Sequence, residues 1–488
     1  MAWYDEAVFY HIYPLGLTGA PEHNEYRSPD EYGAHCLQTL IPWIDHIRKI
    51  GCTALYIGPL FESVGHGYET TDYRKLDSRL GTNEDLKDFV RRCHEAGIRV
   101  VLDGVFNHTG RDFFAFKDLQ AYRENSRYLH WYCNVNFCNN NEYNDGFSYD
   151  NWGGYNLLVK LNTRNPEVRD YLLDTVRFWV SEFDIDGLRL DAADVLDFEF
   201  MRCLRDIANT VKPEFWLMGE VIHGEYGRWV NEHTLNSVTN YHLHKALYSG
   251  HNDHNYFEIA HTVRRQRDMG LGDSVHLYSF VDNHDVARIM TKLQNKAHYL
   301  PVHVLLYTLP GLPSLYYGSE FGIEGKKERG SDASLRPALD LAAMLRSAGI
   351  DPSGNAGQYE TAAEGDSTAA SCLRLITRLG QAHDAFPALS YGAYQELQLT
   401  TTKYAFARGD LIVTVNNADH PETFDIQTQS IGDAWRWHSG DDLKQETTEV
   451  QKPVYIGLLS GKHVDIYDGW VHLEIGANDG EIWVPVNA

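Results

Sequence analysis

The chain has 488 residues, and its 43 basic against 68 acidic side chains give a net charge of −25. Its composition, 43% hydrophobic and 23% charged, is that of a globular protein with a sizeable core, which excludes the disordered and fibrous classes. An acidic surface repels phosphate groups, so we expect neither a nucleic-acid partner nor binding to an anionic membrane. At about 150 residues per domain, the length allows roughly three domains or one large barrel with attachments.

The cysteines and the N-terminus bear on where the protein works. Seven cysteines are scattered along the chain without a CxxC pair, which disfavours a zinc cage. Residues 1–6 show no basic region leading into an apolar run, and no apolar stretch reaches the length of about 18 residues that indicates a membrane span. These features predict a reduced, cytoplasmic protein.

Short apolar runs alternate with segments of helical spacing from residue 8 to residue 317. The expected strands cover residues 8–14, 54–61, 99–106, 187–192, 215–221, 237–241, 275–281 and 314–317. The expected helices cover residues 37–50, 83–96, 169–183, 198–211, 256–269 and 298–308. Because strands that alternate with helices form parallel sheets, this order predicts an α/β fold, a closed (β/α)8 barrel.

Three regions depart from this alternation. Residues 109–160 are rich in Asn, Asp, Tyr and Phe without periodicity, and so long a connection is uncommon unless it is functional. We expect them to form a small subdomain inserted after the third strand, and residues 324–368 to be irregular. Short alternating runs in residues 389–488 predict a C-terminal antiparallel β-sandwich domain. Residues 1–108 and 161–388 then form the barrel.

Acidic side chains end several of the expected barrel strands, where such barrels have their active sites. They are Asp103, Asp191, Glu220 and Asp285. Converging carboxylates suit either a divalent metal or glycoside hydrolysis by an acid and a nucleophile. Arg189 favours hydrolysis, because it shares a strand face with Asp191. Its fixed charge would repel a metal ion, and we expect it to lower the pKa of Asp191.

Four segments carry a resemblance to the α-amylase superfamily, glycoside hydrolase family 13. They are residues 103–108 (DGVFNH), 187–191 (GLRLD), 219–221 (GEV) and 280–285 (FVDNHD). The resemblance covers residues 5–488. It implies a hydrolase that acts on α-linked oligosaccharides through a covalent intermediate and requires no cofactor.

The resemblance also implies a role for each site residue. Asp191 would be the nucleophile and Glu220 the general acid and base, with carboxyls about 5–5.5 Å apart in a retaining enzyme. Asp285 would bind sugar hydroxyls and favour ring distortion. The remaining expected substrate-site residues are Tyr68 beneath the sugar, His108 and His284 on its hydroxyls, Arg189 orienting Asp191, and Asp103 in support.

Residues 158–162 (LVKLN) help to choose among family members. They resemble the Met-Pro-Lys-Leu-Asn motif of neopullulanases, cyclomaltodextrinases and maltogenic amylases, with Val159 in place of proline. This favours an enzyme for cyclic or short branched α-glucans. A plain α-amylase or α-glucosidase acting on linear maltodextrins is the second interpretation. A transferase or isomerase would share the first half-reaction, whereas a non-catalytic sugar-binding homologue is disfavoured because Asp191, Glu220 and Asp285 are all present.

The family also suggests a metal and an assembly. Many members bind calcium between the barrel and the inserted subdomain, which would make Asn107 a ligand, together with Asp145 or Asp150. Relatives of this kind form dimers, so a homodimer is a further expectation.

Aromatic residues make up 12% of the chain. Their rings stack on the apolar faces of sugars, but large barrels also bury many aromatic side chains. For Trp131 and Trp152, both in the expected inserted subdomain, the sequence leaves sugar binding and core packing equally open.

Overall fold

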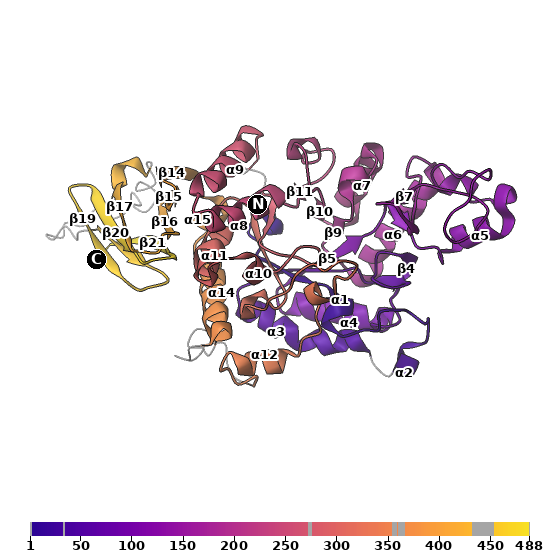
Figure 1. Cartoon of the computed structure of the whole chain (residues 1–488), viewed down its shortest axis with the longest axis horizontal. Coiled ribbons are helices and arrows are strands. Elements are labelled where there is room, and N and C mark those ends of the chain that lie inside the picture. The colour runs from indigo at the N-terminus through magenta and orange to yellow at the C-terminus, as the bar shows by residue number, and fades with distance from the viewer. Residues whose placement is uncertain are drawn as a thin grey trace.

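The computed structural model describes residues 2–32, 35–271, 276–353, 359, 367–431 and 453–487. The molecule is elongated, with a barrel in the middle, an inserted subdomain at one end and a β domain at the other (Figure 1). No helix in the described part of the chain is long and apolar enough to cross a membrane.

The predicted barrel is confirmed. Its parallel strands follow one another around the sheet in the order β11-β10-β9-β5-β2-β1-β13-β12. A bridge between Thr239 and Tyr278 joins the two ends. The strands are β1 (Phe9–Ile12), β2 (Ala54–Ile57), β5 (Arg99–Gly104), β9 (Gly187–Leu190), β10 (Trp216–Gly219), β11 (Ser237–Val238), β12 (Tyr278–Phe280) and β13 (Leu312–Tyr316). Each overlaps a range expected from the sequence.

Alternate residues of each strand point into the barrel and fill it. Phe9 and Trp216 stack there with ring centroids 4.9 Å apart, and Tyr278 closes the same cluster. Because side chains two positions apart share a strand face, the inward rows continue into polar residues near the strand ends. On β10 and directly after it, for example, Trp216, Met218 and Glu220 occupy alternate positions and therefore share the inward face.

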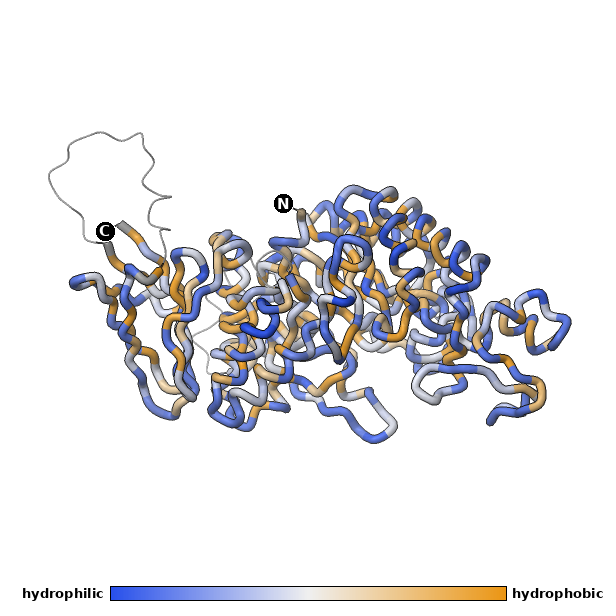
Figure 2. The backbone as a smooth tube through the Cα atoms, turned by 90° about the horizontal axis from the view of Figure 1, so that it is seen from above, coloured by the Kyte–Doolittle hydropathy of each residue, from blue (hydrophilic) through white to orange (hydrophobic). Residues whose placement is uncertain are grey.

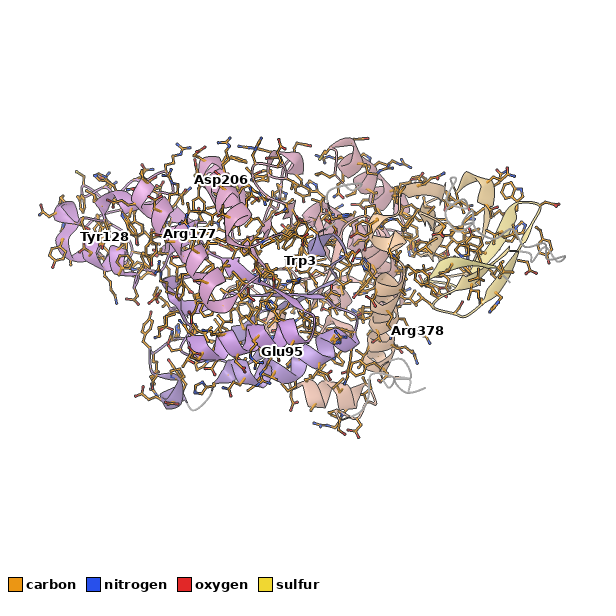
Figure 3. The ribbon with its side chains drawn as sticks, turned by 180° about the vertical axis from the view of Figure 1, so that it is seen from behind. Trp3, Glu95, Tyr128, Arg177, Asp206 and Arg378 are labelled. Carbon is orange, nitrogen blue, oxygen red and sulfur yellow. The ribbon has the colours of Figure 1, made fainter. Side chains whose placement is uncertain are left out.

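Helices surround the barrel. They are α3 (Ile41–Lys49), α4 (Asn83–Glu95), α6 (Pro166–Phe183), α7 (Phe198–Val211), α8 (Tyr241–Asn252), α9 (Tyr256–Asp268), α11 (Tyr299–Thr308) and α14 (Thr368–Ala385). Orange and blue alternate along them in Figure 2, as expected of helices with one buried and one exposed face. Charged side chains such as Glu95, Arg177 and Asp206 lie on their outer surface (Figure 3).

Several helices of the described chain were not predicted from the sequence. Helix α8 buries His244 and His251 where apolar residues would mark a helical face, so its periodicity is hidden. Helix α14 was not predicted at all. Helix α12 (Leu341–Ser347) lies inside residues 324–368, so the expectation that this stretch is irregular was wrong for its middle part.

Caps explain where two of the predicted helices begin. The carboxylate of Asp85 accepts a hydrogen bond from the backbone N–H of Thr82, at 2.7 Å, and completes a capping box at the start of α4. Asn165 caps α6 by accepting from the N–H of Glu167, and Pro166 supplies the first helical residue.

The inserted subdomain is attached by a small sheet. Its strands are β6 (His108–Thr109), β7 (Asn151–Trp152) and β8 (Tyr155–Lys160), in the order β6-β8-β7. Helix α5 (Phe114–Tyr122) forms its outer part (Figure 1). The predicted limits, residues 109 and 160, fall within β6 and β8.

The C-terminal domain is antiparallel, with strand order β14-β15-β16-β21-β18-β19-β20-β17. Its strands are β14 (Tyr394–Leu399), β15 (Lys403–Arg408), β16 (Leu411–Asn416), β17 (Glu422–Gln427), β18 (Pro453–Gly457), β19 (His463–Tyr467), β20 (Trp470–Ile475) and β21 (Asp479–Asn487). Phe424 and Leu473 from one part of the sheet share a buried cluster with Ile412 and Trp483 from the other. The sheet therefore folds over an apolar core of its own.

Candidate active site

One guanidinium brings together the acidic ends of three barrel strands. Arg189 Nη1 donates to both Asp103 oxygens, at 3.0 and 3.1 Å, and to Asp191 Oδ1, at 2.9 Å. Its Nη2 lies 3.0 Å from Glu220 Oε2. Asp103 and Arg189 are register partners on β5 and β9, so the parallel register itself delivers this cluster. The two expected catalytic carboxylates thus contact one side chain.

Backbone geometry fixes the positions of these carboxylates. Ala192, directly after Asp191, adopts a left-handed conformation with φ 47°, which is uncommon for a residue other than glycine. This conformation aims its N–H at Glu220 Oε2, at 3.0 Å. On the other side of the cluster, a Cβ at Gly58 would overlap the Cβ of Asp103. Only glycine leaves room there for Asp103 to reach Arg189.

The pKa of Asp191 differs from the sequence-based expectation. Arg189 does act to lower it, as predicted, but burial is the larger effect and raises the pKa of Asp191 well above its usual value. Burial likewise raises the pKa of Glu220, and the charge of Asp285 acts in the same direction. With one guanidinium facing Asp103, Asp191 and Glu220, full ionisation would leave two uncompensated negative charges in a buried site. The Asp191–Glu220 pair therefore favours holding one proton between them.

A second group of expected residues continues from Asp103. Tyr68 donates from its hydroxyl to Asp103 Oδ2, at 3.2 Å, and lies 2.5 Å from His284 Nε2. The ring of His284 stacks against that of Tyr68, and its Nε2 lies 3.0 Å from Asp285 Oδ2. Tyr68, His284 and Asp285 therefore belong to the same site as Arg189.

Asp285 is held as an anion. Although burial raises its pKa, the positive charges of His284, Arg336 and Arg189 outweigh burial and place the pKa of Asp285 well below its usual range. A third of its side chain remains exposed, so its carboxylate is accessible to a ligand. An accessible anion at this position can accept hydrogen bonds from sugar hydroxyls.

His108 also lies in this site, beside the backbone of Tyr68. Burial lowers the pKa of His108 to about 3, so the imidazole is neutral near pH 7. Its Nε2 has no partner although the residue is 1% exposed. A buried polar atom without a partner is costly, and a ligand hydroxyl would satisfy it.

Asn107 does not lie in an arrangement that resembles a cation site. Its Nδ2 contacts His108 Nδ1 at 3.1 Å. Asp145 pairs through both oxygens with Arg111, at 2.7 and 2.8 Å, and Asp150 accepts from Asn134. Among the residues that the structure describes, no group of three or more His, Cys, Asp or Glu could hold a metal ion. Asp145 and Asp150 are thus paired with other side chains, and the calcium ion expected at Asn107 stays a prediction.

Two residues of the site were missed by the sequence. Arg336 donates from Nη2 to Asp285 Oδ1, at 2.9 Å, and from Nε to the carbonyl of His284, at 3.0 Å. It lies in an aperiodic stretch, so nothing in the sequence marks it. Tyr56 donates to Asp103 Oδ2, at 2.8 Å. The alternation of β2 places Tyr56 on the inward face of the barrel, and this position could have marked it as a residue of the site.

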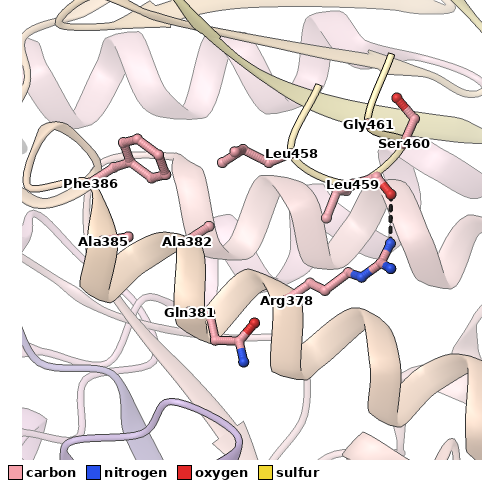
Figure 4. A pocket seen from close by; sticks show the side chains of 9 residues that line it. All are labelled: Arg378, Gln381, Ala382, Ala385, Phe386, Leu458, Leu459, Ser460 and Gly461. Atoms are coloured by element: carbon pink, nitrogen blue, oxygen red, sulfur yellow. Dashed lines mark hydrogen bonds between the residues drawn. The ribbon is translucent and has the colours of Figure 1, made fainter. Parts of the chain in front are cut away.

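A cavity of about 420 Å³ lies elsewhere, between α14 and the 458–461 loop of the C-terminal domain (Figure 4). Arg378 lines it and donates to the carbonyl of Leu459, at 2.6 Å. None of the expected site residues lines this cavity, so it is separate from the carboxylate cluster.

Comparison with known proteins identifies the family of this chain. The family model for the α-amylase catalytic domain matches residues 24–376. The chain belongs to the α-amylase family. Its relatives in that family include a cyclomaltodextrinase from a Bacillus species, 33% identical over 70% of this chain, and a maltogenic α-amylase from Bacillus acidopullulyticus, 32% identical over 67% of it.

The matched region covers 62% and 58% of those two relatives, so the chain spans about three fifths of their length. Among solved structures, a cyclomaltodextrinase superposes with a TM-score of 0.79 at 25% identity, covering 99% of this chain and 78% of the other. The α-amylase family membership therefore rests on sequence and on fold together.

Proposed function

We propose that this member of the α-amylase family hydrolyses α-glucans, with cyclic or short branched maltodextrins as its substrates, and that it does so with retention of configuration. The proposal depends mainly on the guanidinium of Arg189, which contacts Asp191 through Nη1 and Glu220 through Nη2. Relatives named cyclomaltodextrinase and maltogenic α-amylase support the substrate class. Seven free cysteines support a cytoplasmic location.

The contacts of the two carboxylates suggest how the work is divided. Glu220 Oε2 accepts from Arg189 and from the N–H of Ala192, so the shared proton belongs on Oε1. From there Glu220 gives the proton to the glycosidic oxygen as the bond to the anomeric carbon breaks. Asp191 Oδ1 is held by Arg189, so Oδ2 forms the new bond to that carbon. The proton has then moved from Glu220 to the leaving sugar, and Asp191 carries the glycosyl group.

The second half-reaction reverses these roles. Glu220, now a carboxylate, takes a proton from water as the water oxygen attacks the anomeric carbon and the bond to Asp191 breaks. The carboxylate of Asp285 accepts hydrogen bonds from hydroxyls of the sugar whose glycosidic bond is cleaved. The neutral imidazole of His108 exchanges a hydrogen bond with another hydroxyl of that sugar. Stabilisation of the positively charged transition state comes from the anionic Asp191 and Asp285 in a largely buried site.

A substrate panel tests the proposal. The purified protein is incubated with linear, cyclic and branched maltodextrins, and NMR follows the anomer that is released first. We expect free reducing ends with the α configuration. Cleavage of linear chains only would favour a plain α-amylase or α-glucosidase, and transfer products without reducing ends would favour a transferase or isomerase.

The Asp191→Asn variant is the matched control for this panel, because the amide keeps the shape but cannot form the intermediate. We expect its kcat to fall by about 10⁴-fold or more while its circular dichroism spectrum is unchanged. Residual turnover close to that of the wild type would remove Asp191 as the nucleophile. The homodimer and calcium expectations are tested in parallel, by light scattering and by activity with and without a chelator.

A further inference from the structure

Tyr13 directly follows strand β1 and was not among the residues expected in the site. Its side chain is buried, and its hydroxyl donates to the carbonyl of His66, at 2.6 Å. The strand end and this hydrogen bond fix the ring at both of its ends, so the aromatic faces keep one orientation.

The ring of Tyr13 contacts two side chains that carry positive charge near Asp285. The imidazole of His284 is stacked on it, with 5.8 Å between centroids and 17° between planes. The guanidinium carbon of Arg336 lies 4.6 Å from its centroid. Because the face of an aromatic ring is negative, it attracts cations, and the attraction is stronger where water is excluded.

His284 and Arg336 bind Asp285, one on each carboxylate oxygen. Arg336 also donates to the backbone carbonyl of His284, at 3.0 Å. The hydroxyl of Tyr13 is used by His66, so an effect of Tyr13 on Asp285 passes through the two cationic side chains.

The backbone around Tyr13 is packed closely enough to hold this contact. Tyr13 is followed by the short helix α1 (Pro14–Leu17), which contains Gly16. A Cβ on Gly16 would lie 2.4 Å from the carbonyl oxygen of Arg336 and 2.9 Å from a ring atom of Tyr13. Glycine thus allows α1 to press the ring against the segment that carries Arg336.

We propose that Tyr13 is a positioning residue for the hydrolysis. Its ring holds His284 and Arg336 in the places from which they bind Asp285. The inference rests on the proposed function, in which Asp285 accepts hydrogen bonds from the sugar. It predicts that the negative face of the ring matters, and not only its volume.

Two substitutions separate the face of the ring from its volume. Tyr13→Leu fills much of the space without a negative face, whereas Tyr13→Phe keeps the face and loses the hydrogen bond to His66. For maltoheptaose we expect kcat/KM to fall about ten-fold in Tyr13→Leu and less than about three-fold in Tyr13→Phe. Equal losses in the two variants would overturn the proposal, and so would unchanged activity of Tyr13→Leu.

Tyr299→Leu is the matched control for burial and for the lost hydroxyl. Tyr299 on α11 is as buried as Tyr13, and its hydroxyl also donates to a backbone carbonyl, that of Ser319, at 2.7 Å. Its ring also packs on an imidazole, that of His303, with 3.9 Å between centroids. We expect a lower melting temperature for Tyr299→Leu, with kcat/KM at 25 °C within about two-fold of the wild type.

A double-variant cycle tests whether Tyr13 acts through Asp285. Adding Tyr13→Leu to Asp285→Asn should lower kcat/KM by less than about two-fold further, because the carboxylate that the two cations hold is already gone. An effect on the fold alone would multiply the two separate losses. Full multiplication would therefore contradict the positioning role.

A binding cycle keeps this result separate from the proposed hydrolysis. Calorimetry measures the affinity for maltoheptaose in Asp191→Asn, with and without Tyr13→Leu, and then repeats both measurements with Asp285→Asn added. Weakening by Tyr13→Leu that disappears in the Asp285→Asn background supports the role even if the wild type cleaves no glucan. Equal weakening in both backgrounds, no weakening in either, or no binding at millimolar concentration would contradict it.

Discussion

At the scale of single residues, two carboxylates of the site, Asp191 and Asp285, affect stability in opposite directions. Burial raises the pKa of Asp191 in the folded state. Its contribution to stability is therefore fully present below the unfolded pKa of about 4 and is lost as the pH rises through the folded value. The pKa of Asp285 is lowered. Its contribution is present above about pH 4 and is lost as the pH falls through the folded value.

This contrast predicts opposite changes in melting temperature. At pH 7, Asp191→Asn should melt higher than the wild type, by roughly a degree or more, and the difference should shrink as the pH approaches 4. Asp285→Asn should melt lower at pH 7, because Arg336 and His284 lose their anionic partner. Thermal unfolding between pH 4 and pH 8 measures both.

Asp206→Asn provides the control, since Asp206 is exposed on α7 and its replacement should leave the melting temperature unchanged. A lower melting temperature for Asp191→Asn at pH 7 would contradict the argument that burial dominates over Arg189 at this position.

At the scale of elements, the site depends on how closely two strand ends approach. Gly58 follows β2 and faces Asp103 near the end of β5, and a methyl group at residue 58 would overlap Asp103. To relieve this overlap, Asp103 would have to move away from Arg189, whose guanidinium also binds Asp191. The packing of two neighbouring strands thus affects the position of Asp191, the nucleophile of the proposed reaction.

Gly58→Ala should therefore reduce activity. We expect kcat/KM to fall by roughly 10- to 100-fold and the free energy of unfolding by about 1–3 kcal/mol. Gly227→Ala is the matched control, because Gly227 is exposed and its nearest neighbour to an added Cβ is 3.7 Å away. Full activity of Gly58→Ala would show that the β2–β5 contact does not position Asp103.

At the scale of the whole molecule, one buried cation joins the barrel to the C-terminal domain. Arg408 on β15 is 2% exposed. It donates to the carbonyl of Thr308 at the end of α11, at 2.6 Å, and to those of Gly392 and Ser390. A cation at a helix C-terminus is stabilising, and without it these buried carbonyls would lack a partner.

Arg408→Ala should loosen this junction without touching the chemistry. We expect a loss of about 3 kcal/mol or more in unfolding free energy, seen as a melting temperature lower by several degrees, with kcat/KM at 25 °C within about two-fold of the wild type. Arg378→Ala is the control, because Arg378 also crosses the junction but is exposed, and exposed contacts contribute little. A second, independent unfolding transition in the wild type would contradict the coupling of the two domains.

The sequence by itself determined the barrel and the residues at its strand ends, because both follow from local rules. Period-two alternation selects the inward side chains, and parallel strands end at one rim, so Asp103, Arg189, Asp191 and Glu220 could be grouped from their spacing alone. Helix α8 was not predicted, because buried histidines occupy positions where apolar residues would mark the buried face of a helix.

The tertiary structure decided what depends on burial and on contacts between distant segments. Arg336 reaches Asp285 from an aperiodic stretch 51 residues further along the chain. The balance between burial and Arg189 at Asp191 also has no sequence signal, since desolvation depends on every neighbour that excludes water. For the same reason Trp131 and Trp152 were indistinguishable in sequence, and only packing made Trp131 a core residue and left Trp152 exposed beside His108.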